Sequence, residues 1–320
     1  MSRLRSHNRN IAWLVAVLFW ALAFSSGTGA SGKSYSLEAT PVAEGVWVVV
    51  GSTDNFSKAN GGNILNTGFI ETGEGVVVID TGPSRRYGEE FRALIESHTS
   101  EPIVKVLITH HHPDHAFGSQ AFEPNTLYML DESASLLEQD GEAFSDNMYR
   151  MIGDWMRGTE VTVPMNRVQP GLLSLGNRQL RLIAMQGHTG ADLVVLDETS
   201  GALFASDMVF FNRALTTPQT PGVALWRSEI RQLAQLPFSL VVPGHGPVIR
   251  DDRAFLQMID YLTWLDDVLA GSAARGLSAS EVIDTAIPER FSEVEGARYE
   301  LVRTVSHLYA DYEKRALNRH

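Results

Sequence analysis

The 320-residue sequence predicts an α/β protein, on three observations. Short runs rich in valine, isoleucine and leucine recur between turn signals, which is typical of strands. Segments with apolar residues at helical spacing separate some of these runs, so strand, helix and strand alternate. The last part of the chain carries helical stripes without strand-like runs.

The first series of strands is expected between residues 46 and 109. Its strand-like runs are residues 46–51, 63–71, 76–80 and 103–109. Between the last two, residues 91–98 place Phe91, Leu94 and Ile95 on one face of a helix. This order of strand, helix and strand indicates an α/β unit.

A second series follows a helix-prone stretch at residues 132–160, which Gly141 and Gly153 interrupt. Its strand-like runs are residues 178–185, 191–197, 202–206 and 239–244, with a helix at 226–236 before the last of them. The two series therefore look alike in content, although the sequence contains no repeat of fixed period.

The chain beyond residue 250 is expected to be helical. Apolar residues recur at three- and four-residue steps at Phe255, Ile259, Leu262, Leu265 and Leu269, and again at Leu301, Val305, Leu308 and Tyr312. Ser278 and Glu281 have the spacing of a capping box. We interpret the stripes as packing surfaces. The predicted organisation is a signal peptide over residues 1–30, a main domain over 31–270 and a helical extension over 271–320.

The amino terminus has the three-part layout of a secretory signal peptide. Arg3, Arg5 and Arg9 precede the apolar run 11–24, and small residues at Thr28 and Ala30 allow cleavage after Ala30. The run is shorter than the roughly 20 residues that span a bilayer, so no stable membrane insertion is expected after cleavage. We expect export to the periplasm or the medium by the general secretory route, with an uncleaved anchor as the alternative.

Composition excludes some partners and restricts the chemistry of any site. With 26 basic and 38 acidic residues the formal net charge is −12, so no overall positive field attracts nucleic acid. The chain contains no cysteine, so it forms no disulfide. Any bound metal must therefore be held by histidine, aspartate or glutamate.

Residues 106–118 carry the strongest chemical signal, because an apolar strand runs directly into His110, His111, His112, Pro113, Asp114 and His115. In an extended chain His110 and His112 point the same way, so both can bind one metal ion while His111 points away. The turn at Pro113 then directs Asp114 and His115 towards a neighbouring position.

Three further polar residues follow strand-like runs, at His188, Asp207 and His245. They complete two metal sites that share a water molecule, with Asp207 able to bridge both. One site would use His110, His112 and His188, and the other Asp114, His115 and His245. Asp80, at the end of the run 76–80, is expected to hydrogen-bond a ligand or the metal-bound water.

This set of residues resembles the metallo-β-lactamase fold superfamily of dinuclear zinc hydrolases. The matching features are the H-x-H-x-D-H run at 110–115, the three later ligands, and the VVVIDTG run, whose Asp80 corresponds to a supporting aspartate of the superfamily. The resemblance extends over roughly residues 40–270. It implies a four-layer αβ/βα sandwich with a C-terminal helical extension, and two Zn²⁺ ions in its cleft, with iron or manganese as alternatives.

Asp207 resembles the bridging carboxylate of the glyoxalase II type. The stretches 196–215 and 239–248 are most similar to exported quinoprotein relay system zinc metallohydrolases. The resemblance implies an exported hydrolase of small-molecule substrates, linked to a periplasmic quinoprotein system. A metal-bridging hydroxide would attack an ester, thioester or amide, with Asp114 and Asp80 as candidate catalytic residues.

Other functions stay open at this point. A true metallo-β-lactamase would use the same three-histidine and Asp-His-His sites, and a metal-binding maturation factor would not be catalytic. A mononuclear iron dioxygenase has the same fold with fewer ligands. Candidate substrate contacts are Arg213, Phe211 and Asn63, which lie in loops between the ligand-bearing strands.

Overall fold

The computed structural model describes residues 33–318, and the first of its two sheets contains the first predicted series of strands. The strands lie side by side in chain order as β1 (Thr40–Ala43), β2 (Val46–Val49), β3 (Thr67–Glu71), β4 (Val76–Ile79), β5 (Ile103–Leu107), β6 (Leu127–Met129) and β7 (Asn166–Arg167). The strands from β1 to β4 pair antiparallel, and those from β4 to β7 pair parallel.

The second sheet has the order β12-β11-β10-β9-β8. Its strands are β8 (Gly171–Leu175), β9 (Arg178–Met185), β10 (Asp192–Asp197), β11 (Ala202–Phe210) and β12 (Leu240–His245). Only β11 and β12 pair parallel in this sheet, across the helix that connects them. In each sheet antiparallel strands are thus followed by a parallel strand–helix–strand unit, with β6 and β7 added beyond it in the first sheet, and this agrees with the similar content predicted for the two halves.

Seven α-helices lie in the described part of the chain. They are α1 (Arg85–His98), α2 (Pro113–Ala116), α3 (Asp131–Ile152), α4 (Val223–Leu233), α5 (Arg253–Ala274), α6 (Ala279–Ile283) and α7 (Ala297–Leu317). Ser84 caps α1 by accepting a hydrogen bond from the backbone N–H of Tyr87 (3.2 Å). The predicted capping box of Ser278 and Glu281 is present at the start of α6.

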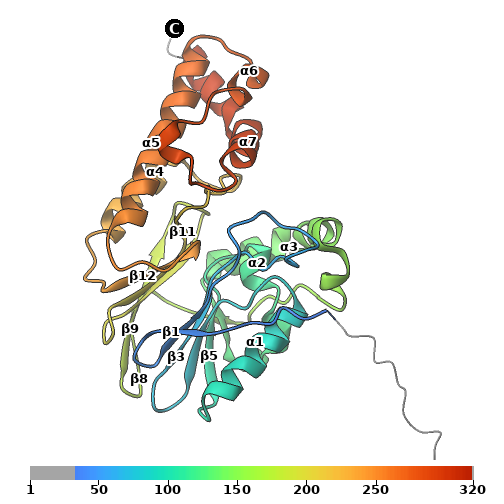
Figure 1. The fold of residues 1–320 in the computed structure, drawn as a ribbon, viewed down its shortest axis with the longest axis vertical. Coiled ribbons are helices and arrows are strands. Elements are labelled where there is room, and N and C mark those ends of the chain that lie inside the picture. Colours follow the sequence, from blue (N-terminus) through green and yellow to red (C-terminus); the bar gives the residue numbers. More distant parts are fainter. Residues whose placement is uncertain (1–32, 319–320) are drawn as a thin grey trace, which may run out of the picture. The chain divides into compact units, whose positions relative to one another are not determined.

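Alternate residues along the strands face different cores, which gives the molecule four layers. In β4, Val76 and Val78 pack with α1 and α3, whereas Val77 and Ile79 pack against the second sheet. In β10 the neighbouring residues alternate in the same way, and the outer face of that sheet packs with α4, α5 and α7. Figure 1 shows α1 beside the sheet of β3 and β5. The predicted αβ/βα sandwich is confirmed.

Several elements differ from the sequence prediction for identifiable reasons. Gly141 does not interrupt α3. A Cβ at this position would lie 2.6 Å from Val161 Cγ1, so the glycine permits close packing of Val161 on the helix. Gly153, by contrast, ends α3 as predicted, with a positive φ of 62° that glycine adopts freely. Strand β11 continues to Phe210, so Asp207 lies inside the strand, where the register is irregular, and not after its end.

The predicted signal peptide and the predicted domain boundary have different outcomes. The predicted signal peptide and its cleavage after Ala30 lie outside the described residues. The predicted boundary between residues 270 and 271 falls inside α5. Among the described residues, none of the helices combines the length and apolar character that crossing a bilayer requires.

Candidate metal centre

The predicted ligands come together from four separate strands. Strand β5 leads into His110 and then into the short helix α2, which carries Asp114 and His115. His188 follows β9 and His245 is the last residue of β12. Asp207 reaches the same place from within β11, where Ser206 adopts a left-handed φ of 47°.

Four of these side chains form a first buried cluster, made of His110, His112, His188 and Asp207, whose ligand atoms lie within 4.8 Å of one another. His112 Nδ1 lies 2.8 Å from His188 Nε2. Asp207 Oδ2 lies 3.2 Å from His188 Nε2 and 3.9 Å from His110 Nε2. These atoms can converge on one cation.

A second buried cluster is made of Asp114, His115 and His245. Asp114 Oδ2 lies 3.4 Å from His245 Nε2 and 3.7 Å from His115 Nε2. The other carboxylate oxygen of Asp207, Oδ1, lies 3.1 Å from His115 Nε2 and 3.3 Å from His245 Nε2. Asp207 therefore presents one oxygen to each cluster, which is the arrangement expected of a bridging ligand.

Unsatisfied atoms show that the residues fit a bound metal. His110 Nε2, His115 Nε2 and Asp207 Oδ1 are buried, and none makes a hydrogen bond in the described part of the chain, because the approach of the last two to 3.1 Å lacks hydrogen-bond geometry. Leaving a buried polar atom unpaired costs free energy, so such atoms need a partner. Imidazole nitrogens and a carboxylate oxygen that converge in this way are metal ligands by type.

The second nitrogen of every ligand imidazole has a fixed partner, which sets the ring orientation and the tautomer. His188 Nδ1 donates to the Thr216 carbonyl (3.0 Å) and His245 Nδ1 to the Ile64 carbonyl (2.6 Å). His112 Nε2 donates to Gln219 Oε1 (3.2 Å), which leaves its Nδ1 for the metal. His115 Nδ1 has the Asp80 carboxylate as its partner, and His110 Nδ1 has the Thr109 hydroxyl.

Asp80 orients two of the ligand histidines, His115 directly and His110 through Thr109. It accepts hydrogen bonds from His115 Nδ1 (2.8 Å), from the Thr109 backbone N–H (2.8 Å) and from the Thr109 hydroxyl (2.9 Å). Its φ of 60° is in the left-handed region, which aspartate tolerates better than most residues. Asp80 does not line the pocket described below, so it acts as a positioning residue for a ligand, one of the two roles predicted for it.

Burial and neighbouring charges shift the pKa values of the ligands in different directions. Burial opposes protonation of His115, but the carboxylates of Asp207, Asp80 and Asp114 outweigh it and raise its pKa well above the usual value, and burial raises the pKa of Asp114, so a bound cation has to displace protons from these two residues. Burial lowers the pKa of His188 to about 3, and burial with nearby imidazoles lowers the pKa values of His110 and His112 well below the usual range. Burial opposes ionisation of Asp207, but the imidazoles of His245, His115 and His188 outweigh it and hold its pKa low. At neutral pH His110, His112 and His188 are neutral and Asp207 is ionised.

A cavity of about 320 Å³ opens over both clusters. Its lining includes the ligands His112, Asp114, Asp207 and His245, so the candidate catalytic residue Asp114 faces it. Three further parts of the wall come from segments that the sequence did not connect with the site. These are the loop with Asn55 and Phe56, helix α3 with Phe144, Asn147 and Met151, and helix α7 with Tyr299, Glu300 and Arg303.

The candidate substrate contacts are placed differently from one another. Arg213 lines the cavity. Phe211 does not, because its side chain is buried in the core formed with α4 and α5. Asn63 does not line it either, and its backbone instead closes the turn of residues 60–63 with a bond to the Asn60 carbonyl (3.1 Å). Contact of Phe211 or Asn63 with a substrate in this cavity is therefore not supported.

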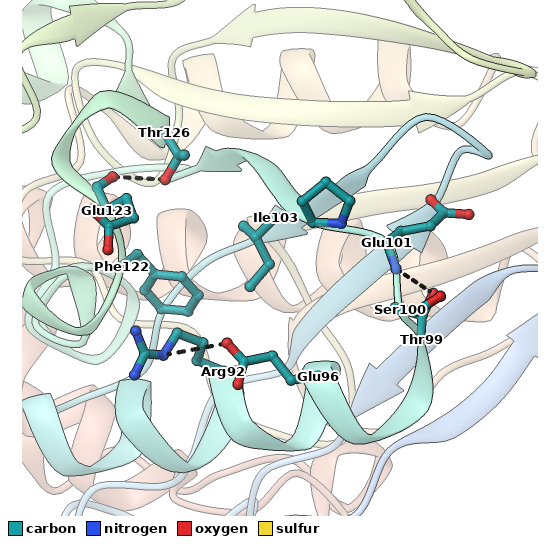
Figure 2. A pocket seen from close by; sticks show the side chains of 10 residues that line it. Arg92, Glu96, Thr99, Ser100, Glu101, Ile103, Phe122, Glu123 and Thr126 are labelled. Carbon is teal, nitrogen blue, oxygen red and sulfur yellow. Dashed lines mark hydrogen bonds and ion pairs between the residues drawn. The ribbon is translucent and has the colours of Figure 1, made fainter.

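Another pocket, of about 450 Å³, lies between α1 and the start of β5, and Figure 2 shows its side chains. It contains none of the predicted site residues. Its polar groups make local contacts, such as the pair of Arg92 and Glu96 (3.8 Å) and the bond from the Thr126 hydroxyl to the Glu123 carbonyl (2.7 Å). We assign no chemistry to it.

Comparison with known proteins identifies the family. The chain belongs to the metallo-beta-lactamase superfamily, whose family model matches residues 60–245, and it is a metal-dependent hydrolase of that superfamily. It is 23% identical over 234 residues to the probable metallo-hydrolase YqjP of Bacillus subtilis. This alignment covers 59% of this chain and 69% of the relative. It is 25% identical over 234 residues to the human acyl-coenzyme A thioesterase MBLAC2, covering 63% of this chain and 80% of the relative.

Solved structures agree on the fold. A metallo-beta-lactamase from Pontibacter korlensis superposes with a TM-score of 0.58 at 22% identity, over 71% of this chain and 99% of that one. A metallo-beta-lactamase from Hirschia baltica gives a TM-score of 0.57 at 19% identity, over 72% and 98%. At these identities the likeness concerns the fold alone.

Proposed function

We propose that this protein is an exported dinuclear zinc hydrolase that cleaves a thioester, ester or amide-type bond in a small molecule. The observation that carries the proposal is the position of Asp207, whose two carboxylate oxygens face different ligand clusters. A carboxylate between two cations offsets part of their mutual repulsion. The similarity to acyl-coenzyme A thioesterases supports a carbonyl substrate and favours the thioester within that class.

The ligand set favours zinc. Five imidazoles and two carboxylates surround the two positions, and imidazole suits zinc better than it suits magnesium or calcium. Iron and manganese can occupy similar ligand sets, so metal identity has to be measured.

Two zinc ions held here would polarise a substrate carbonyl and supply ionised water near neutral pH. The chain's own contribution is positioning. Asp80, Thr216 and Ile64 fix ligand orientation through the second nitrogens of three imidazoles. The cavity wall from α3 and α7 holds the substrate above the clusters and excludes bulk water, which strengthens electrostatic interactions inside the site.

Export and the quinoprotein link are the parts of the proposal that rest on sequence alone. The signal-like layout of residues 1–30 supports export, and the stretches 196–215 and 239–248 support the relationship to quinoprotein relay system hydrolases. Amino-terminal sequencing of the extracytoplasmic protein should find a start near Ser31. Recovery of the full-length chain from the cytoplasm alone would contradict both parts.

The hydrolase proposal is tested by metal analysis of the purified protein and a matched substrate panel. We expect about two zinc equivalents and chelator-sensitive hydrolysis of a thioester, with a parallel ester, amide and β-lactam assayed under the same conditions. Preferred turnover of the lactam would favour a true metallo-β-lactamase. Two bound metals without turnover of any panel member would favour the maturation factor, and one iron with oxygen uptake on a thiol would favour a dioxygenase.

A further inference from the structure

We propose that the substrate of this site carries a carboxylate and that Arg303, on helix α7, binds it. The inference rests on the proposed hydrolase function and adds the substrate class. Helix α7 lies far from every metal ligand in the sequence, yet Tyr299, Glu300 and Arg303 line the cavity over both clusters. Arg213 and Arg303 are the only cationic side chains in that lining.

Arg213 is already used by the protein. Its side chain is 4% exposed. Its guanidinium donates to the carbonyl of Ala214, to Asn55 Oδ1 (3.0 Å) and to Glu300 Oε1 (3.3 Å). These contacts tie the loop after β11 to α7, so we assign Arg213 a structural role beside the cavity and not the substrate contact expected from the sequence.

Arg303 differs from Arg213 in exposure and in the number of its partners. Its side chain is 34% exposed at the cavity. One nitrogen, Nη1, lies 3.1 Å from each carboxylate oxygen of Glu300. Among residues 33–318, Nε and Nη2 of Arg303 have no hydrogen-bond partner. A guanidinium carries five N–H donors, so Arg303 keeps donors for a ligand while Glu300 holds it in place.

The charges of this group match a monoanion. Glu300 is buried and forms ion pairs with the guanidiniums of Arg213 and Arg303. The three side chains together carry two positive charges and one negative charge. The net single positive charge attracts one carboxylate, which suits the planar fork of arginine.

The cavity also has an apolar side. Phe56, Phe144 and Met151 lie in the same lining as Arg303 and the ligands. Ligand sites typically combine apolar walls with a few polar groups that fix orientation. The inferred substrate therefore has a hydrolysable carbonyl at the metal clusters, an apolar portion against these side chains and a carboxylate at Arg303.

The test compares two thioesters of N-acetylcysteamine with the same carbon chain, glutaryl and pentanoyl, which differ in having a carboxylate or a methyl group at the far end. We expect the zinc-loaded protein to prefer the glutaryl thioester. Arg303→Gln should lower the ratio of kcat/KM for glutaryl over pentanoyl by at least about 10-fold, mainly through KM, since hydrogen bonds to charged groups contribute about 1.5–3 kcal/mol. Lys314→Gln removes a charge from an exposed position of the same helix and should leave the ratio unchanged.

Direct binding gives a second readout that does not depend on turnover. Calorimetry should show that glutarate binds the wild-type protein and that Arg303→Gln weakens this binding at least about 10-fold. Equal losses for both thioesters, a preference for the pentanoyl thioester, or equal binding of glutarate by the wild-type protein and Arg303→Gln would each overturn the carboxylate assignment. If neither thioester is hydrolysed, the hydrolase proposal fails, and glutarate binding still decides the role of Arg303.

Discussion

Asp80 and His115 are joined by a buried hydrogen bond of 2.8 Å from the imidazole Nδ1 to the carboxylate Oδ2. The same oxygen accepts the Thr109 hydroxyl at 2.9 Å, and that hydroxyl lies 3.1 Å from His110 Nδ1. One carboxylate thus orients an imidazole of each ligand cluster, directly in one case and through a threonine in the other. The two clusters are mechanically coupled through this residue.

Asp80→Asn should weaken metal binding by about 10- to 100-fold, the range observed when a partner of a ligand is removed. Asparagine tolerates the left-handed backbone at this position, so the fold should be retained. Competition with a chromophoric zinc chelator measures the affinity. Unchanged zinc affinity at both ligand clusters would show that Asp80 only closes the turn after β4.

Asp207→Asn should lower metal occupancy of the second cluster, made of Asp114, His115 and His245. The substitution keeps the shape of the side chain but removes the negative charge that offsets the repulsion between two bound cations. Asp207→Ala should do the same and should lower turnover by at least about 100-fold. Metal stoichiometry and steady-state rates measure the two effects. If both variants keep two metals and normal turnover while Asp114→Ala loses them, Asp207 is not a bridging ligand.

Gly244→Ala should disrupt the centre without changing any ligand. A Cβ at this position would lie 1.9 Å from Asp207 Oδ1 and 2.7 Å from the Asp207 backbone nitrogen, so the carboxylate must move. We expect loss of metal, read by elemental analysis. Gly271→Ala is the matched control, because the nearest atom to its Cβ is the end of Arg275 at 3.4 Å and alanine favours helix α5.

Acidification should destabilise the metal-free protein partly through His111, which is not a ligand. Burial lowers its pKa to about 4, although Asp140 opposes this shift. The folded-state pKa is below the unfolded value of about 6.5, so the stabilisation is present above pH 6.5 and is lost as pH falls towards 4. The loss amounts to about 3 kcal/mol at full protonation.

Comparison with His111→Phe isolates this contribution, because phenylalanine keeps a planar ring but does not titrate. The free energy of unfolding should be measured by denaturant titration in excess chelator between pH 7.5 and 4.5. The wild-type protein should lose more stability than the variant across this interval. Parallel profiles would show that His111 does not carry the predicted proton linkage.

The ligand set was predictable from sequence because most of its information is local. His110, His112, Asp114 and His115 lie within six residues, directly after an apolar run, and strand alternation fixes which side chains share a direction. His188 and His245 each come shortly after or at the end of a strand-like run. The ends of neighbouring strands meet at one edge of a sheet, which places both residues at the site. The strand and helix periodicities that define the layers are local properties of the same kind.

Tertiary packing decided the remainder. The sequence predicted Asp207 as a bridging ligand but not its place inside a strand, because β11 continues past the predicted end with register shifts in its pairing with β12. Gly141 lies inside α3 where Val161 packs closely on the helix, a contact that its own neighbours in sequence do not reveal. Glu300 and Arg303 reach the cavity because α7 packs on α5, and contacts between segments so far apart along the chain leave no periodic signal in the sequence.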